Sequence, residues 1–298
     1  MPTHLDQAQV RSLLNWPTAI DALRQAQTSG PGAVSAPART SVPAPGGHVL
    51  VMPAVDADHF GIKIAGVAPE NPARDLPRIT GTYLLHDATT LMPVLAVDGP
   101  ALTLVRTAAL SALAVDALAD PGASNLLVYG TGPQAAAHIE ALRTVRDFRT
   151  VAVVGRTAES SRRFAAEHGV AEAGPGALGS ADVVACCTSA HTPLFDGTRA
   201  GRDVTVVAMG AHTLDARELD AATLRGAQVV VEDPAAASRE AADVVAALQA
   251  GDIDGTVPLH AVLNGEVPVD RGRRRVFRSV GMAWEDLAVA TALRRMLS

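Results

Sequence analysis

Gly130, Gly132 and Ala135 form a G-x-G-x-x-A pattern that is suited to binding a dinucleotide. The pattern lies between an apolar segment that is predicted to be a strand and a segment from Pro133 that is predicted to be a helix. The first glycine permits a tight turn, the second lets the backbone approach a pyrophosphate, and the alanine allows close packing of helix on strand. The free N–H groups at the helix start would bind the phosphates. The expected cofactor-binding residues of this turn are Gly130, Gly132, Pro133, Gln134 and Ala135.

The next apolar strand ends in Gly155, Arg156 and Thr157, where an NAD-binding domain usually presents Asp or Glu to the adenosine ribose. An acidic side chain there accepts hydrogen bonds from a 2′-hydroxyl and repels a 2′-phosphate. Arg156 and Thr157 can instead bind that phosphate through charge-assisted hydrogen bonds. The sequence therefore favours NADP(H) over NAD(H), with a solvated surface arginine as the alternative interpretation of Arg156.

Two further cations stand in apolar surroundings. Arg106 lies within an Ala-rich segment that is predicted to be one helix, where an unpaired charge would be costly, so it needs a bound anion or an internal ion pair. Lys63 follows the alternation of GIKIAG and points away from Ile62 and Ile64, so it faces a cleft or solvent if those isoleucines face the core. A guanidinium can orient a carboxylate, and a buried ammonium can hold polar groups and supply a proton.

The elements that must position these residues fall into two groups. Residues 1–118 contain short apolar or alternating runs separated by Pro, Gly, Asn and Asp, which predict a mixed, largely antiparallel sheet followed by the Ala-rich helix. Residues 119–277 alternate short apolar strands with helices, as in a doubly wound parallel sheet of the Rossmann type. The last segment has helical spacing from Met282 and is expected to return to the first group. The sequence thus predicts an α/β protein with one α+β domain at 1–118, completed by 278–298, and a dinucleotide-binding domain at 119–277.

The composition narrows the class of partner. With 298 residues, 48% hydrophobic residues and a net charge of −6, the chain is globular, and no basic run precedes the short RGRRR at Arg271, so we expect a small metabolite and no nucleic acid. No cationic leader and no run of about 18 apolar residues is found, so we expect a cytoplasmic protein outside the membrane. Cys186 and Cys187 are adjacent in an apolar run and are expected to be buried and reduced, and no metal site is expected.

Seven stretches, in this order, resemble the ornithine cyclodeaminase/mu-crystallin family over nearly the whole chain. They are PART from Pro37, VMPA from Val51, GIKIAG from Gly61, LTLVRTAALSALA from Leu102, GTGPQA from Gly130, VVAMGAHTLDARELD from Val206 and RSVGMAWEDLA from Arg278. The resemblance implies that the first domain, completed by the last helix, binds the substrate and forms a homodimer. It also implies that the family's carboxylate-binding and catalytic positions fall on Arg39, Lys63 and Arg106.

The nicotinamide half of the cofactor site is expected at two further places. The family closes over the nicotinamide ring at the position of Ser279 and Gly281, although a helix cap and a turn would explain these two residues equally well. Thr188 and the turn that contains Met209, Gly210 and Ala211 follow predicted parallel strands, at the edge where such sheets bind ligands.

The sequence departs from the cyclodeaminases of this family at three positions. Their loop after VVAMG carries an Asp that acts in the chemistry and a Lys four residues later, and this chain has His212 and Ala216 there. A threonine that contacts the cofactor in that branch is Arg78 here, which could reshape the pocket or contact a second anion. Cyclodeamination needs a carboxylate to manage the released ammonia, so its loss argues against that activity. His212 could deliver a proton near neutral pH, or have no catalytic role.

We therefore expect an NAD(P)H-dependent oxidoreductase of amino-acid metabolism, nearer to the ketimine reductases of the mu-crystallin branch. It would reduce the C=N bond of a small imino carboxylate such as pyrroline-2-carboxylate or piperideine-2-carboxylate. Arg39 and Arg106 would anchor the carboxylate, and Lys63 would hydrogen-bond or protonate the reacting group. The alternatives are an ornithine cyclodeaminase, an NAD-dependent amino-acid dehydrogenase, a non-catalytic protein that binds NADPH or another ligand, and a synthase that acts on a larger conjugate.

Overall fold

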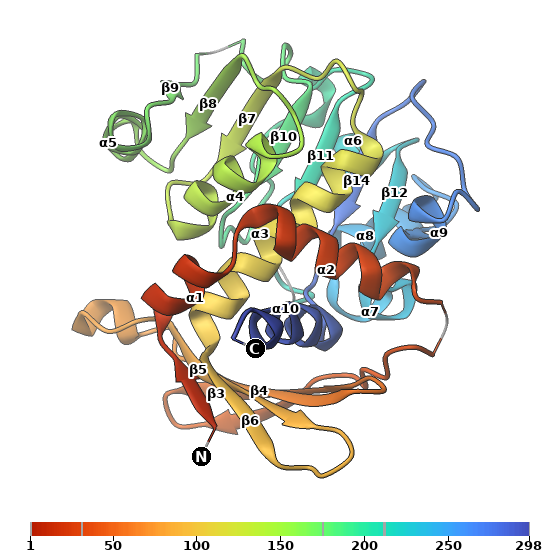
Figure 1. Cartoon of the computed structure of the whole chain (residues 1–298). Coiled ribbons are helices and arrows are strands. Elements are labelled where there is room, and N and C mark those ends of the chain that lie inside the picture. The colour runs from red at the N-terminus through yellow and green to blue at the C-terminus, as the bar shows by residue number, and fades with distance from the viewer. Residues whose placement is uncertain (1, 31, 175, 211–212, 298) are drawn as a thin grey trace. The chain divides into compact units, whose positions relative to one another are not determined.

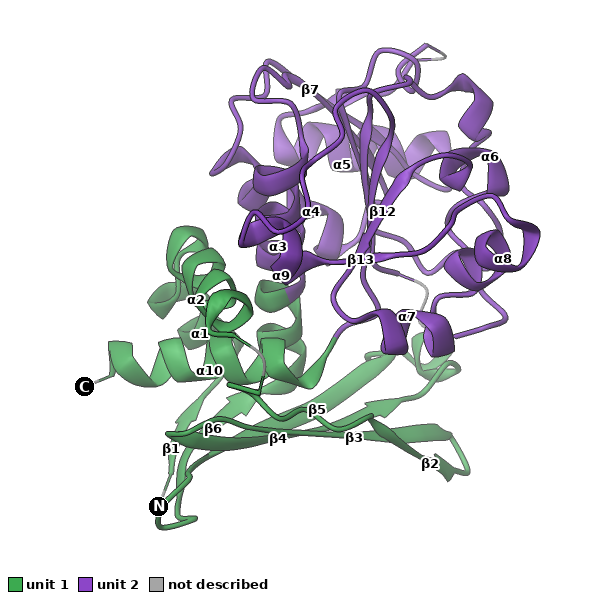
Figure 2. Ribbon diagram, turned by 90° about the vertical axis from the view of Figure 1, so that its right-hand side faces the viewer, with its two compact units in different colours: residues 1–106, 282–298 green, residues 107–281 purple. Residues whose placement is uncertain are grey.

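The computed structural model describes residues 2–30, 32–174, 176–210 and 213–297. The chain divides into two compact units (Figure 2). Unit 1 contains residues 1–106 and 282–298, and unit 2 contains residues 107–281. The last helix therefore belongs with the first part of the chain, although the whole of unit 2 separates them in sequence.

Unit 1 is built on a six-stranded sheet in the order β1-β6-β5-β4-β3-β2, in which only the pair β1 and β6 is parallel. Its strands are β1 (Thr3–Leu5), β2 (Thr40–Ala44), β3 (Gly47–Val55), β4 (His59–Val67), β5 (Ile79–Asp87) and β6 (Pro93–Asp98). Its helices are α1 (Gln7–Leu13), α2 (Trp16–Thr28), the 3-10 helix η1 (Asn71–Arg74) and α10 (Ala283–Met296), with the first part of α3 (Gly99–Leu118). Helix α10 lies between α2 and the sheet and contacts β3, β4 and β5 (Figure 1).

The two faces of this sheet differ, and the difference decides the direction of Lys63. Along β4, Gly61, Lys63 and Ala65 are buried on the face that α10 covers, whereas Ile64 is 45% exposed on the other face. The isoleucines therefore do not face the core that α10 covers, and the alternative of a solvent-exposed lysine does not hold. The alternation itself placed Lys63 opposite Ile64, as the sequence predicted.

Unit 2 is built on an eight-stranded, entirely parallel sheet in the order β13-β12-β14-β11-β10-β7-β8-β9. Its strands are β7 (Asn125–Tyr129), β8 (Thr150–Val154), β9 (Ala171–Glu172), β10 (Val183–Cys186), β11 (Thr205–Ala208), β12 (Gln228–Val231), β13 (Val257–Pro258) and β14 (Arg275–Arg278). The connecting helices are α4 (Pro133–Arg143), α5 (Ala158–His168), η2 (Gly197–Arg199), α6 (Ala221–Leu224), α7 (Pro234–Glu240), α8 (Ala242–Ala250) and α9 (Leu259–Leu263). The predicted combination of a doubly wound parallel sheet and a mixed sheet is confirmed.

Strand β14 begins at the end of the basic run RGRRR, and two of the four arginines of that run are held within unit 2, whereas Arg271 and Arg273 are exposed. The strand lies between β11 and β12, and its first residue, Arg275, is only 1% exposed. Arg274 donates hydrogen bonds to the backbone carbonyls of Gly201 and Ala222. These two arginines therefore bind within their own unit.

Helix α3 runs from one unit into the other, and residues 107–118, which the sequence analysis assigned to the first domain, belong to unit 2. Two contacts tie this part of α3 to the second unit. The ring of His138 on α4 bonds the hydroxyl of Ser111, and Arg146 forms an ion pair with Asp116. By length and composition α3 could cross a membrane, in contrast to our expectation that no segment would qualify, but most of its apolar window is buried within the structure.

Candidate active site

Lys63 lies at the centre of a buried cluster of charges in unit 1. Its side chain is 4% exposed, and its Nζ atom is 2.7 Å from Oδ2 of Asp286 on α10 and 3.4 Å from the hydroxyl oxygen of Thr103 on α3. Burial lowers the pKa of Lys63 below its usual value, and the negative charge of Asp286 opposes that effect. The ammonium is therefore held in a low-dielectric setting, where its proton is less tightly bound than that of a lysine in water.

Arg106 forms the second cation of the cluster. It is 7% exposed, and its Nη1 atom donates to Oε2 of Glu285 in a short buried ion pair. The other oxygen of Glu285 accepts the backbone N–H of Met282 at 2.5 Å and so caps α10. The internal ion pair that the sequence analysis left open for Arg106 is therefore present. Because Glu285 is also a helix cap, the position of Arg106 is tied to the start of α10.

Asp286 connects the two cations, since its Oδ1 atom lies 3.7 Å from Nε of Arg106. Tyr83 on β5 adds a buried phenol to the same group of residues. Its hydroxyl has no hydrogen-bond partner among the described residues, and burial, followed by the nearby charge of Asp286, raises its pKa well above the usual value. Two cations, two carboxylates and a phenol thus meet in the interior of unit 1, which is an arrangement suited to binding a charged polar molecule and to moving a proton.

Unit 2 carries the dinucleotide turn at the end of β7. Gly130 has a φ of 121°, and a Cβ atom there would overlap the backbone carbonyl of Cys187, so only glycine fits. Gly132 begins α4 without a side-chain cap, and a Cβ atom there would meet nothing within 4 Å. The side-chain oxygen of Gln134 is buried and has no partner among the described residues. An open backbone approach, uncapped helix N–H groups and an unpaired amide fit the pyrophosphate of a dinucleotide.

The residues after β8 form a tight turn into α5. Gly155 is tightly surrounded, because a Cβ atom would overlap the hydroxyl of Ser160. Thr157 caps α5 by accepting the backbone N–H of Ser160 at 3.1 Å. Arg156 is exposed beside this helix start. A cation next to a helix N-terminus favours a bound phosphate.

A buried glutamate organises the ends of β10 and β11. Oε1 of Glu218 accepts the hydroxyl of Thr188 at 2.6 Å and its backbone N–H at 3.1 Å, and Oε2 accepts the backbone N–H of Gly210 at 2.6 Å. Burial raises the pKa of Glu218. Met209 is half-buried beside Gly210, whereas Ala211 and His212 lie outside the described residues. Thr188 and Gly210 are therefore held together, as their shared position at the strand ends predicted.

A second buried glutamate holds the turn after β14. Oε1 of Glu232 accepts the hydroxyl of Ser279 at 2.5 Å and the backbone N–H of Gly281 at 2.9 Å. The N–H of Val280 donates to the other oxygen of the same carboxylate at 3.0 Å. The donors of Ser279 and Gly281 are thus occupied within the protein. Ser279 is also only 1% exposed, so these donors are committed to Glu232 and not directed to solvent.

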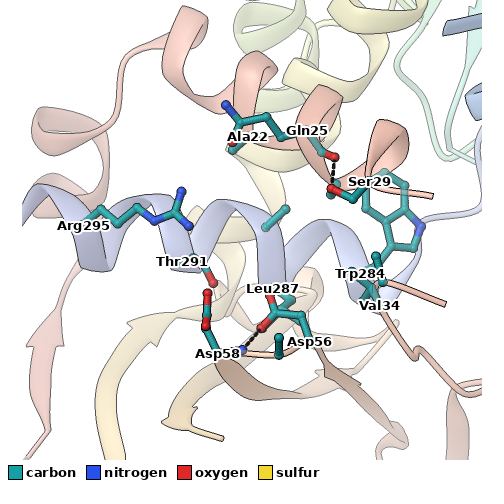
Figure 3. A pocket seen from close by; sticks show the side chains of 14 residues that line it. Ala22, Gln25, Ser29, Val34, Asp56, Asp58, Trp284, Leu287, Thr291 and Arg295 are labelled. Carbon is teal, nitrogen blue, oxygen red and sulfur yellow. Dashed lines mark hydrogen bonds between the residues drawn. The ribbon is translucent and has the colours of Figure 1, made fainter. Parts of the chain in front are cut away.

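A separate pocket of about 260 Å³ lies on another side of α10 (Figure 3). It is lined by Trp284, Leu287 and Thr291 of α10, with Asp58 and Gln25 among its other residues. At about 100° per residue, Trp284 and Thr291 lie on the side of α10 opposite Asp286. The pocket includes neither Lys63 nor Arg106, so we do not place the chemistry there.

Comparison with known proteins covers nearly the whole chain. The model of the ornithine cyclodeaminase/mu-crystallin family matches residues 3–298. The chain belongs to this family. A Δ1-pyrroline-2-carboxylate/Δ1-piperideine-2-carboxylate reductase of Azospirillum brasilense is 37% identical over 305 residues, covering 98% of this chain and 95% of the relative. The ketimine reductase mu-crystallin of Mus musculus is 33% identical over 272 residues, covering 88% and 86%.

Solved structures share the fold. An archaeal alanine dehydrogenase dimer with bound NAD superimposes with a TM-score of 0.91 at 25% identity, covering 99% of this chain and 95% of that one. The family membership predicted from the sequence is confirmed. Of the substrate-binding positions that the family resemblance implies, Lys63 and Arg106 lie in one cluster. Arg39 is half-buried just before β2, and Arg78 is exposed before β5.

The sequence analysis did not identify the four carboxylates that organise these sites, Glu218, Glu232, Glu285 and Asp286. Two signals point to the last two. Arg106 needed a buried partner, and RSVGMAWEDLA places two adjacent acidic residues at the start of a mostly apolar helix. Nothing in the sequence pattern alone pairs Glu218 or Glu232 with its partners.

Proposed function

We propose that this protein is an NAD(P)H-dependent reductase of the C=N bond of small cyclic imino carboxylates, such as Δ1-pyrroline-2-carboxylate and Δ1-piperideine-2-carboxylate. The observation that carries the proposal is the buried cluster in which Lys63 and Arg106 meet within unit 1. Relatives of over 30% identity that span almost the whole chain and bear these activities in their names support it.

The residues of unit 1 supply recognition and a proton. The guanidinium of Arg106 binds the substrate carboxylate, and Arg39 is a second candidate for that contact. The ammonium of Lys63 donates a hydrogen bond or a proton to the imine nitrogen. Burial of the cluster excludes water and strengthens both interactions. The nicotinamide cofactor, when bound, supplies the hydride.

The residues that follow β8 decide the expected preference between NADP(H) and NAD(H). We expect NADP(H) to bind more tightly than NAD(H), because Arg156 and the start of α5 favour a 2′-phosphate. Arg156 occupies the position at which an acidic residue would repel that phosphate. The residues that would hold the cofactor are those of the Gly130 turn, Arg156 and Thr157, and the rim formed by Thr188, Met209 and Gly210. Ser279 and Gly281 border the same rim in this proposal.

We further propose a homodimer in the cytoplasm. Val42 and Ile64 are 48% and 45% exposed on the face of the unit 1 sheet that α10 does not cover, and a second copy of the same face would bury them. The similar archaeal alanine dehydrogenase, which is described as a dimer, supports the proposal of a dimer. A cytoplasmic location is consistent with two free, buried cysteines and a need for reduced nicotinamide.

The test is to follow the absorbance of NADPH and of NADH with four substrates in parallel. These are Δ1-pyrroline-2-carboxylate, Δ1-piperideine-2-carboxylate, ornithine, and pyruvate with ammonia. Oxidation of NADPH with the two cyclic imines, with proline and pipecolate as products, supports the proposal. Turnover of ornithine to proline would replace it with cyclodeamination, and activity with NADH, pyruvate and ammonia alone would replace it with an amino-acid dehydrogenase. Cofactor binding without oxidation of any substrate would indicate a binding protein.

A further inference from the structure

Lys63 is the only lysine among the 25 basic residues of this sequence. Arginine forms the other buried pairs, such as Arg106 with Glu285 and Arg278 with Asp243. An arginine would bind a carboxylate as well or better, because its planar fork makes two parallel hydrogen bonds. Arginine cannot release a proton in a protein, however, whereas lysine can. A single lysine at a buried position therefore points to a requirement for a cation that gives up its proton.

The neighbours of Lys63 show what controls that proton. The carboxylates of Asp286 and Glu285 face it from α10, and the guanidinium of Arg106 faces it from α3. Tyr83 on β5 faces the same carboxylate of Asp286. Asp286 is the nearest of these groups, at 2.7 Å, and both residues of the pair are almost completely inaccessible to solvent. Glu285 is already committed to Arg106 and to the cap of α10.

Asp286 and Arg106 act on Lys63 in opposite directions. Burial lowers the pKa of Lys63, the charge of Asp286 raises it, and the charge of Arg106 lowers it further. The carboxylate of Asp286 is therefore the main group that keeps Lys63 charged in this interior. Asp286 also fixes the direction of the Lys63 side chain, because Nζ of Lys63 lies against Oδ2 of Asp286.

We propose that Asp286 is the positioning residue of the proton donor, and that its carboxylate keeps the ammonium of Lys63 charged and directed for transfer to the substrate nitrogen. The inference rests on the proposed imine reduction. In this step an N–H bond of Lys63 breaks and an N–H bond of the substrate forms, while the imine carbon accepts the hydride of NAD(P)H. The neutral amine of Lys63 then regains a proton from water. Asp286 remains ionised throughout and forms no covalent bond.

The single lysine allows a direct test that needs neither cofactor nor substrate. Protein grown with lysine labelled at Cε and Nε gives one side-chain lysine signal in an NMR spectrum, and its shift against pH gives the titration midpoint of Lys63. We expect the midpoint in Asp286→Asn to lie at lower pH than in the unchanged protein. The matched control is Asp116→Asn, which removes the carboxylate of an ion pair in unit 2, and its midpoint should equal that of the unchanged protein. An unchanged or higher midpoint in Asp286→Asn would overturn the proposal.

A second variant covers the case in which Asp286→Asn does not fold. Lys63→Arg keeps a cation opposite Asp286 and removes the transferable proton. We expect it to bind a non-reducible cyclic carboxylate, pyrrole-2-carboxylate, in calorimetry, and to lose at least about a hundredfold in kcat. Retention of kcat in Lys63→Arg would contradict the role of the proton. The NMR titration is independent of turnover, so failure of the proposed reduction and failure of this inference give different results.

Discussion

The guanidinium of Arg106 and the carboxylate of Glu285 form an ion pair that is buried at both ends, with side chains 9% and 0% exposed. The two residues are far apart in sequence. Arg106 lies on α3 and Glu285 lies on α10, so the ion pair joins these two helices. A substrate carboxylate that binds Arg106 has to share this cation with Glu285. The stability of unit 1 and the recognition of the substrate are therefore linked through one side chain.

Replacement of Glu285 by glutamine is expected to destabilise the protein by about 3–5 kcal/mol, because it leaves Arg106 buried without its counter-charge. A bound carboxylate can take over that charge. Pyrrole-2-carboxylate should therefore raise the melting temperature of Glu285→Gln by more than it raises that of the unchanged protein. Equal increases in the two proteins would show that the ligand does not bind at Arg106.

Reversal of charge at Arg156 is expected to change the cofactor preference. In Arg156→Glu the affinity for NADPH should fall by about tenfold or more, since the 2′-phosphate loses a cation and meets an anion, while the affinity for NADH stays the same or improves. Arg143→Glu, an exposed charge reversal at the end of α4, serves as the matched control. Titration of nicotinamide fluorescence measures both affinities. Equal losses for the two coenzymes would show that Arg156 does not contact the phosphate.

The two glycines of the dinucleotide turn should respond differently to alanine. Gly132→Ala meets open space and an ordinary φ, so the melting temperature should stay within about 2 °C while NADPH affinity falls about tenfold or more, because the methyl group occupies the approach of the pyrophosphate. Gly130→Ala should destabilise the fold itself, because the methyl group overlaps the carbonyl of Cys187 at a positive φ. Thermal unfolding and cofactor titration separate the two effects. Normal NADPH binding by Gly132→Ala would exclude this turn from the cofactor site.

His138 should make the protein less stable in acid. Its ring is fully buried between the carbonyl of Gln134 and the hydroxyl of Ser111, and burial lowers its pKa from 6.5 to about 4. The folded state therefore resists a proton that the unfolded chain accepts, so stability is lost as the pH falls from the unfolded pKa toward the folded one. Between pH 7 and pH 5 this amounts to about 2 kcal/mol. Urea unfolding of the protein and of His138→Gln at both pH values measures the difference, and an equal pH dependence in the two proteins would contradict it.

Sequence patterns were sufficient to predict the local elements that carry these residues. The glycine turn, the strand end at Arg156 and the alternation around Lys63 are local, and each lies in the structure where its pattern predicted. The carboxylates were missed because their partners are distant in sequence: Asp286 meets Lys63 from the last helix, and Glu232 meets Ser279 across the sheet. A carboxylate that neutralises a buried cation need not lie at any fixed distance from that cation in the sequence. The sequence analysis missed the division of α3 between the two units for a similar reason. The sequence of this Ala-rich helix does not show which distant residues contact Ser111 and Asp116.

The recognition of the substrate carboxylate by Arg106 is tested most directly by removing the carboxylate from the substrate. Steady-state kinetics with NADPH should compare Δ1-pyrroline-2-carboxylate with Δ1-pyrroline, which has the same ring and the same C=N bond. We expect kcat/KM to be about a thousandfold higher for the carboxylate, because the analogue leaves a buried cation without its ligand. In Arg106→Met this ratio should fall sharply. Comparable kcat/KM values for the two imines in the unchanged protein would contradict the assignment of this cluster as the substrate site.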